Sequence, residues 1–252
     1  MNGEPTGPGA FLPPPELQRL NALFLDFDGT LVEIAPSPGQ VDAPPELRAL
    51  LVAVAARLDG AVAVISGRSL DDLARQLRPF AGVLIGQHGL ERRRSDGRVI
   101  RWSAAPALAK IRARLAEFAR HHEGVMVEDK GATIALHFRS APWLAARCRD
   151  IVRRAIDATG GTYEAIDGKM VVELVPEGSG KGGAIAALVA EPPFAGRVPI
   201  FVGDDSVDEE GFSVIDRLGG VSVHVGRGPS VARHRLGSVA EVRAWLARGA
   251  SP

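Results

Sequence analysis

The sequence contains one cysteine in 252 residues, Cys148, which excludes a disulfide framework and is typical of a reducing compartment. Its 30 basic and 30 acidic side chains cancel, so no net field attracts nucleic acid or a membrane surface. No apolar run is long enough to span a bilayer. These absences predict a cytoplasmic globular protein that has neither nucleic acid nor a membrane as a partner.

The remaining composition predicts one layered core with an insertion. Residues 1–20 begin with a stretch rich in Gly and Pro that lacks the basic start and apolar segment of a signal peptide, and we expect a disordered tail. In residues 21–103 and 177–252, short apolar runs alternate with helical patterns. This alternation predicts an α/β fold with a doubly wound, Rossmann-like parallel sheet.

The pattern changes in residues 104–176. A helical segment at 106–120 precedes a candidate hairpin, and a second helical segment from Pro142 precedes another. Cys148 lies at an apolar position of this second helix, so we expect it to be buried. The order helix, hairpin, helix, hairpin predicts an inserted α+β cap domain, an antiparallel sheet with two helices. A domain attached at two points could close over a site in the core.

The strongest chemical signal is a pair of acids after a predicted buried strand, Asp26 and Asp28 in LFLDFDGTLVE. In extended backbone, side chains two positions apart point the same way. Two carboxylates this close raise each other's pKa unless a cation neutralises them. Oxygen ligands without nearby His or Cys favour Mg²⁺. The plainer alternative is an acidic turn, but the Gly and Thr that follow suit a sharp turn and an anion.

Two further segments offer groups that could hold a phosphate. Ser66 follows the apolar run AVAVI and could bind a phosphate oxygen, although the same segment also fits an ordinary helix start. Lys181 lies among glycines at the start of a predicted helix. An ammonium group there can neutralise a phosphoryl group, or the segment is simply a loop.

A cluster of acids follows the apolar run VPIFVG. Asp204 is the natural third oxygen ligand of a cation, because it comes directly after the strand. Asp208 could touch the ion through water or orient Lys181, and the sequence leaves both open. Part of the cluster also suits the first turn of a helix, where acids are favourable.

Taken in order, these segments resemble the four signatures of the haloacid dehalogenase-type phosphatases. The resemblance implies a catalytic core of that type, with Asp26 as the nucleophile and Asp28 as the general acid and base. It implies that Ser66 and Lys181 hold the phosphate. It also implies a Mg²⁺ ion, whose ligands are Asp26, the Asp28 carbonyl and Asp204, with Asp205 and Asp208 in contact directly or through water.

Finer details resemble the trehalose-6-phosphate phosphatase family, from about Leu23 to the C-terminal helix. They lie in LFLDFDGTLVEIAPSP, ISGRS, GQHGLE, VEDKGATIALHFR, GKMVVELVPEGSGKGGAI and VGDDSVDEEGF. In that family a Glu-x-Lys pair of the cap and a Glu before the Lys loop bind sugar hydroxyls, and these map onto Glu128, Lys130 and Glu173. The resemblance implies hydrolysis of trehalose 6-phosphate to trehalose and phosphate through an aspartyl-phosphate intermediate.

Plainer alternatives exist for the sugar-binding candidates. Charged side chains on a hairpin can recognise hydroxyl-rich ligands, yet a cross-strand ion pair on a solvated face looks the same in sequence. The remaining candidates for substrate binding are Gly67, Arg68, His88 and Arg139. A packed core histidine and a surface arginine are the alternatives for the last two.

The sequence departs from the family at two positions. Val207 stands where the family usually has Thr, and Val175 stands where it has Arg before Pro. Neither change removes a proposed carboxylate. The alternative functions are a phosphatase for another sugar phosphate, such as sucrose 6-phosphate or a glycosylglycerate phosphate, and a catalytically silent sugar-phosphate-binding module. The complete charge set argues against the silent module. The oligomeric state stays open, with a monomer among the options.

Overall fold

The structure, a computed structural model, describes residues 12–34, 41–102, 107–158, 162–168, 170–177 and 179–250. The chain forms two compact units. One contains Met1–Val99 and Lys181–Pro252, and the other contains Ile100–Gly180. The predicted insert, residues 104–176, lies within the second unit.

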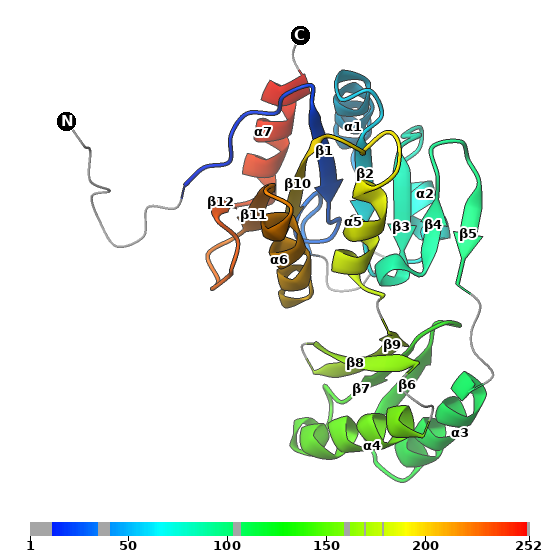
Figure 1. Ribbon diagram of the computed structural model, residues 1–252. Helices are drawn as coiled ribbons and strands as arrows, with labels where there is room; N and C mark the ends of the chain where they lie inside the picture. Colours follow the sequence, from blue (N-terminus) through cyan, green and yellow to red (C-terminus); the bar gives the residue numbers. More distant parts are fainter. Residues whose placement is uncertain are drawn as a thin grey trace. The chain divides into compact units, whose positions relative to one another are not determined.

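The first unit contains seven strands of an eight-stranded sheet with the strand order β12-β11-β10-β1-β2-β3-β4-β5, and the boundary between the two units falls within β5 (Figure 1). The strands are β1 (Asn21–Leu25), β2 (Val62–Ile65), β3 (Val83–Gly86), β4 (Glu91–Arg93), β5 (Val99–Arg101), β10 (Val198–Gly203), β11 (Val221–Val225) and β12 (His234–Leu236). All pairs from β12 to β3 are parallel, and β4 pairs antiparallel with β3. The predicted doubly wound α/β core is confirmed.

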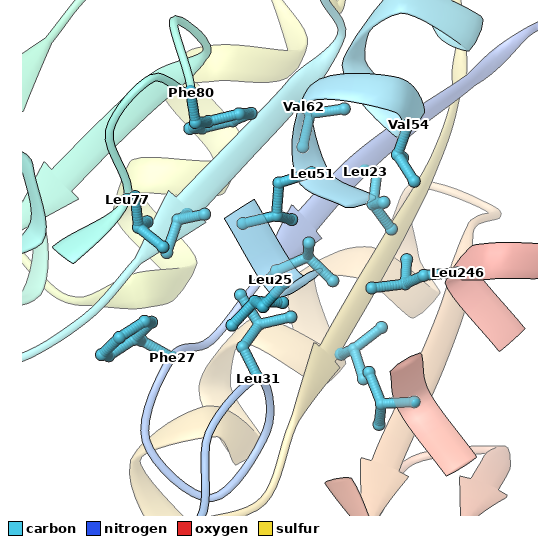
Figure 2. Close-up of a cluster of buried hydrophobic side chains, with 14 of the residues drawn as sticks. Leu23, Leu25, Phe27, Leu31, Leu51, Val54, Val62, Leu77, Phe80 and Leu246 are labelled. Atoms are coloured by element: carbon cyan, nitrogen blue, oxygen red, sulfur yellow. The ribbon is translucent and has the colours of Figure 1, made fainter. Parts of the chain in front are cut away.

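Helices cover both faces of this sheet. They are α1 (Pro45–Arg57), α2 (Leu70–Gln76), α5 (Lys181–Val189), α6 (Glu209–Arg217) and α7 (Val239–Ala250). Leu23 and Leu25 of β1 belong to a cluster with side chains of α1, α2 and α7, part of which Figure 2 shows. Phe24, between them, packs with α5 and α6. Because both faces of β1 are buried, the strand is apolar at successive positions instead of alternate ones.

The loop after β1 is anchored in the same core. Phe27 and Leu31 are buried in the cluster of Figure 2. Arg243 of α7 donates two hydrogen bonds, of 2.9 and 2.7 Å, to the carbonyl oxygen of Leu31. Since Phe27 points into the core, its neighbours Asp26 and Asp28 are directed away from it. Packing of the loop therefore presents both acids at the edge of the sheet.

Residues 12–20 differ from the expected disordered tail. Leu17 is only 5% exposed and packs closely against Gly249 of α7. The indole Nε1 of Trp245 donates a 2.9 Å hydrogen bond to the carbonyl oxygen of Pro15. The prediction was wrong here because a few apolar contacts with a distant helix order a segment whose composition is typical of disorder. Residues 1–11 of the predicted tail lie outside the described residues.

The second unit contains an antiparallel sheet with the order β6-β7-β9-β8 (Figure 1). Its elements are α3 (Ala107–Arg120), β6 (Met126–Asp129), β7 (Ile134–His137), α4 (Ala145–Asp157), β8 (Tyr163–Gly168) and β9 (Val171–Pro176). Side chains of α3 and α4 share one buried cluster with the sheet, and the buried Cys148 of α4 is part of it. The predicted antiparallel sheet with two helices is confirmed. Among the helices that the structure describes in both units, none is long and apolar enough to cross a membrane.

We expect Leu17→Ala to lower the free energy of unfolding by about 2 kcal/mol, because it removes buried methyl groups. Leu20→Ala is the matched control: Leu20 is 70% exposed, so its truncation should be nearly neutral. Urea denaturation of the two variants measures the difference. Equal unfolding free energies would mean that the segment before β1 contributes nothing to the core.

Candidate active site

Three parallel strands of the first unit end beside one another. In the sheet, β10 lies next to β1 and β1 next to β2, so their carboxyl ends share one edge. The residues that follow these ends are Asp204, Asp26 and Ser66. The backbone N–H of Asp26 still donates to the carbonyl oxygen of Val202 at 2.9 Å, which holds the loop after β1 against β10. The predicted phosphatase residues are thus brought together by the sheet itself.

A buried lysine lies at the centre of this edge. Lys181, the first residue of α5, donates from Nζ to Oδ1 of Asp26 and to Oδ1 of Asp208, each at 2.5 Å. All three side chains are buried. Burial alone would lower the pKa of Lys181, but the charges of Asp208 and Asp26 outweigh that effect and raise it. The ammonium group is therefore held in its charged form.

Asp208 also organises the loop after β10. Its Oδ2 accepts hydrogen bonds from the backbone N–H groups of Asp204, at 3.0 Å, and Asp205, at 3.1 Å. One carboxylate therefore orients the lysine with one oxygen and the acidic loop with the other. Of the two sequence-based interpretations, direct contact with Lys181 is the one present in this arrangement.

The carboxylates at this edge are crowded. Asp26, Asp204 and Asp208 each offer an oxygen, and these oxygens lie within 4.8 Å of one another. Burial raises the pKa of Asp26 to about 8, with Lys181 opposing the shift and Asp208 and Asp204 adding to it. Burial, followed by the charge of Asp208, raises the pKa of Asp204 to about 6. One lysine does not neutralise three acids, so the cluster favours a further positive charge.

Two polar atoms at this edge are available for a ligand. Oδ2 of Asp26 and Oγ1 of Thr30 are buried and have no hydrogen-bond partner among the described residues. A buried carboxylate oxygen without a donor is costly unless a cation or donor reaches it. The all-oxygen donor set fits a hard divalent ion such as Mg²⁺.

Gly29 allows the loop after β1 to pass close to Asp204. Its φ of +79° lies in the left-handed region, and a Cβ added there would lie 2.0 Å from Oδ2 of Asp204. Any other residue at position 29 would be strained and would displace this carboxylate. Gly29 is thus needed so that the side chain of Asp204, a candidate metal ligand, can occupy its position.

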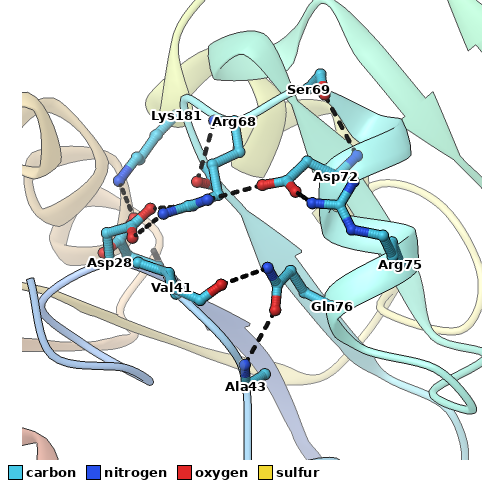
Figure 3. A network of polar contacts seen from close by, with 11 residues as sticks. Asp28, Val41, Ala43, Arg68, Ser69, Asp72, Arg75, Gln76 and Lys181 are labelled. Atoms are coloured by element: carbon cyan, nitrogen blue, oxygen red, sulfur yellow. Dashed lines mark hydrogen bonds and ion pairs between the residues drawn. The ribbon is translucent and has the colours of Figure 1, made fainter. Parts of the chain in front are cut away.

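Asp28 is held differently from Asp26. Arg68 donates from Nε and Nη2 to both carboxylate oxygens of Asp28, at 2.6 and 2.7 Å, as Figure 3 shows. The guanidinium group also donates to Asp72 at 2.7 Å and lies 5.4 Å from the centre of the Phe27 ring. The Asp28 carboxylate is therefore not part of the three-acid cluster. It stays a prediction that the carbonyl oxygen of Asp28 binds a metal. It also stays a prediction that Arg68 binds substrate.

The segment after β2 brings several candidates to the same place. Ser66 is buried, and its Oγ accepts a 3.2 Å hydrogen bond from the backbone N–H of Arg68. A Cβ on Gly67 would lie 2.5 Å from Nε2 of His88, so the glycine makes room for this ring. His88 has a φ of +54°, and its backbone N–H donates to the carbonyl oxygen of Ser66 at 3.0 Å. His88 therefore lies against the predicted phosphate-binding segment.

Asp205 has a local task in the acidic loop. It is the exposed N-cap of a 3-10 turn (Ser206–Asp208), and its Oδ1 accepts from the backbone N–H of Ser206 at 2.6 Å. It does not belong to the three-acid cluster found among the described residues. Its predicted contact with a metal therefore has less geometric support than those of Asp26, Asp204 and Asp208.

The remaining candidates lie in the second unit. Nζ of Lys130 donates to Oε1 of Glu173 at 3.0 Å, and Oγ1 of Thr133 donates to the same oxygen at 3.2 Å. Glu128 lies on β6 and contacts His137. Arg139 is exposed on the turn after β7. The predicted sugar-binding charges thus form real contacts with one another, and their part in substrate binding stays a prediction.

A family model described as trehalose-phosphatase matches residues 24–241. The chain is also 42% identical over 233 residues to the trehalose-6-phosphate phosphatase of Escherichia coli (strain K12), with 92% of this chain and 87% of that protein covered. The chain belongs to the trehalose-phosphatase family. This membership identifies it as a hydrolase that acts as a phosphatase.

Solved structures extend the likeness to the fold of this trehalose-phosphatase family member. The C-terminal domain of the trehalose-6-phosphate phosphatase of C. albicans matches with a TM-score of 0.77 at 19% identity, covering 97% of this chain and 99% of that one. A haloacid dehalogenase-like hydrolase from Bacteroides thetaiotaomicron matches with a TM-score of 0.65 at 16% identity, covering 90% and 98%. At these identities the likeness concerns the fold alone, which the chain shares with this haloacid dehalogenase-like hydrolase.

Sequence reasoning missed the role of Asp72 in this phosphatase. Its carboxylate accepts a hydrogen bond from Nη1 of Arg68 and so fixes the orientation of the arginine that holds Asp28. The two residues are four positions apart, a spacing that brings side chains together at a helix start, and this signal was available. The segment was instead interpreted only as a phosphate site or as an ordinary helix start.

We expect Asp208→Ala to lower the free energy of unfolding by roughly 3–5 kcal/mol, because it removes one of the two carboxylates that hold the buried ammonium and leaves two backbone N–H groups without their acceptor. Asp205→Ala is the matched control from the same loop. It removes an exposed cap and should cost about 1 kcal/mol or less. Urea denaturation measures both. A loss for Asp208→Ala no larger than that for the control would contradict the central position of this carboxylate.

Proposed function

We propose that this phosphatase hydrolyses trehalose 6-phosphate to trehalose and inorganic phosphate through an aspartyl-phosphate intermediate. The observation that carries the chemistry is the buried ammonium of Lys181 between Asp26 and Asp208, with Asp204 beside them. The substrate is inferred from the family and from the E. coli relative, which is named a trehalose-6-phosphate phosphatase.

The proposed cofactor is Mg²⁺, held by Asp26, Asp204 and the carbonyl of Asp28, with Asp208 close by. The unpartnered Oδ2 of Asp26 and the raised pKa values of Asp26 and Asp204 support a cation at this position. When bound, the ion would keep Asp26 ionised and offset negative charge on the phosphoryl oxygens.

In the first half-reaction a carboxylate oxygen of Asp26 attacks the phosphorus atom. The bond between phosphorus and the sugar oxygen breaks, and Asp28 gives its proton to the departing oxygen, since an alkoxide is a poor leaving group. Lys181 neutralises charge on the phosphoryl oxygens, and Ser66 offers a hydroxyl to one of them. The product is trehalose, with the phosphoryl group on Asp26.

In the second half-reaction water attacks the phosphorus atom of the aspartyl phosphate. Asp28, now ionised, takes a proton from that water as the new P–O bond forms. The bond between phosphorus and Asp26 breaks, which regenerates the carboxylate and releases phosphate. The two hydrogen bonds from Arg68 hold the Asp28 carboxylate in one orientation for this step.

We propose that the sheet of the second unit recognises the sugar through Glu128, Lys130 and Glu173. Ala135 of β7 pairs with Glu128 on one side and with Glu173 on the other. The two glutamates therefore lie on the same face, roughly 10 Å apart across two strand spacings, with only a methyl group between them. Carboxylates and an ammonium group in this arrangement offer both acceptors and donors to sugar hydroxyls.

Replacing the nucleophile tests the proposed chemistry. Asp26→Asn should abolish phosphate release, because an amide does not attack phosphorus, while the far-UV circular dichroism spectrum stays unchanged. Asp42→Asn is the control, since Asp42 is an exposed acid outside the site. Phosphate release from trehalose 6-phosphate is measured for both variants and for the wild-type protein under identical conditions. Substantial turnover by Asp26→Asn would contradict the assignment of Asp26 as the nucleophile.

A panel of sugar phosphates tests the substrate and the cofactor together. Phosphate release should be fastest with trehalose 6-phosphate, slower with sucrose 6-phosphate and glucose 6-phosphate, and absent after metal chelation until Mg²⁺ is restored. Glu128→Ala and Lys130→Ala should remove the preference while some hydrolysis of the smaller ester remains. Tight binding of sugar phosphates without any phosphate release would instead favour the silent binding module.

A further inference from the structure

We propose that His137 is a positioning residue for sugar recognition that acts through Glu128, an inference that rests on the proposed role of Glu128 in binding the sugar. Nε2 of His137 lies 2.9 Å from Oε2 of Glu128. Among the described residues, His137 is the partner that the structure gives to this carboxylate. The two residues come from neighbouring strands and are nine positions apart in the sequence.

The strand register places His137 on the same face as the sugar-binding candidates. Ile134 and Leu136 of β7 point into the cluster shared with α3 and α4. Side chains alternate along a strand, so Ala135 and His137 point to the opposite face. Glu128 pairs with Ala135, which puts Glu128 on that face too, one diagonal step from His137.

The two glutamates of this face are held in corresponding ways. Glu173 receives donors from Lys130 and Thr133 and has a side chain only 14% exposed. The Glu128 side chain is 48% exposed, and a long exposed side chain has several accessible rotamers. The contact with His137 restricts these rotamers before a ligand arrives. Pre-organisation of this kind lowers the entropic cost of binding.

The chemistry of the contact leaves Glu128 able to bind a hydroxyl. An imidazole with its proton on Nε2 donates to one carboxylate oxygen, in the neutral and in the charged form of the ring. The second oxygen of Glu128 stays an acceptor for the sugar. His137 belongs to the second unit and has no part in the proposed phosphoryl transfer, so its removal should affect binding and not the chemical steps.

The test compares steady-state kinetics of the full chain on trehalose 6-phosphate and glucose 6-phosphate, with Mg²⁺ present. His137→Ala should raise KM for trehalose 6-phosphate about three- to tenfold, the value of one net hydrogen bond, with kcat unchanged. His137→Gln, whose amide nitrogen can occupy the place of Nε2, should restore most of the wild-type KM. A histidine that only stabilised the fold would change the urea midpoint and leave KM as it was.

Two comparisons decide whether the effect passes through Glu128. In a Glu128→Ala background, His137→Ala should raise KM no further, because the group it positions is gone. Arg112→Ala is the matched control: Arg112 pairs with Asp129 from α3, on the other face of the same strand, and KM should not change.

The outcomes separate this inference from the proposed function. A wild-type preference for trehalose 6-phosphate together with an unchanged KM in His137→Ala would overturn the role of His137 alone. Equal increases in KM with and without Glu128 would also overturn it. A wild-type enzyme without any preference for trehalose 6-phosphate would overturn the proposed function, and this inference with it.

Discussion

The site depends on one ammonium group buried among carboxylates. Lys181 joins the end of β1, through Asp26, to the turn after β10, through Asp208. Burying a charge without a partner costs roughly several kcal/mol of folding free energy. The buried lysine and the buried acids therefore stabilise one another, and removing either one would destabilise the fold. Because Asp208 also holds the backbone at Asp204, the same pair sets the position of the crowded acids. In the proposed mechanism, phosphoryl transfer uses this preformed arrangement of charge.

The fold and the positions of the candidate residues at one edge of the sheet were largely predictable, whereas the side-chain pairings were not. Apolar runs that end in Asp26, Ser66 and Asp204 mark buried parallel strands, and parallel strands bring their carboxyl ends to one edge. The bond between Arg68 and Asp28 depends on side-chain directions across forty residues, which local pattern does not contain. The packing of Leu17 on α7 was missed for the same reason, since it depends on a distant helix.

The second unit organises its charges by a different device from the core. In the core, strand ends and loops converge on a buried lysine. In the second unit the register of β6, β7 and β9 sets the spacing of Glu128 and Glu173, and short side-chain contacts fix their orientation. The register of a sheet is strongly specified, because a slip of one strand by one residue would move all its side chains to the opposite face. A single side chain on this face can therefore be exchanged while the spacing of the two glutamates is retained.

The fork between Arg68 and Asp28 has a consequence for the proposed proton transfers. Bidentate donation by the guanidinium fixes the orientation of the Asp28 carboxylate and occupies one lone pair on each of its oxygens. In the proposed mechanism Asp28 exchanges a proton first with the departing sugar oxygen and then with water, so both partners must approach the lone pairs that Arg68 leaves open. The contact that orients Asp28 thus also limits the directions from which a proton can reach it.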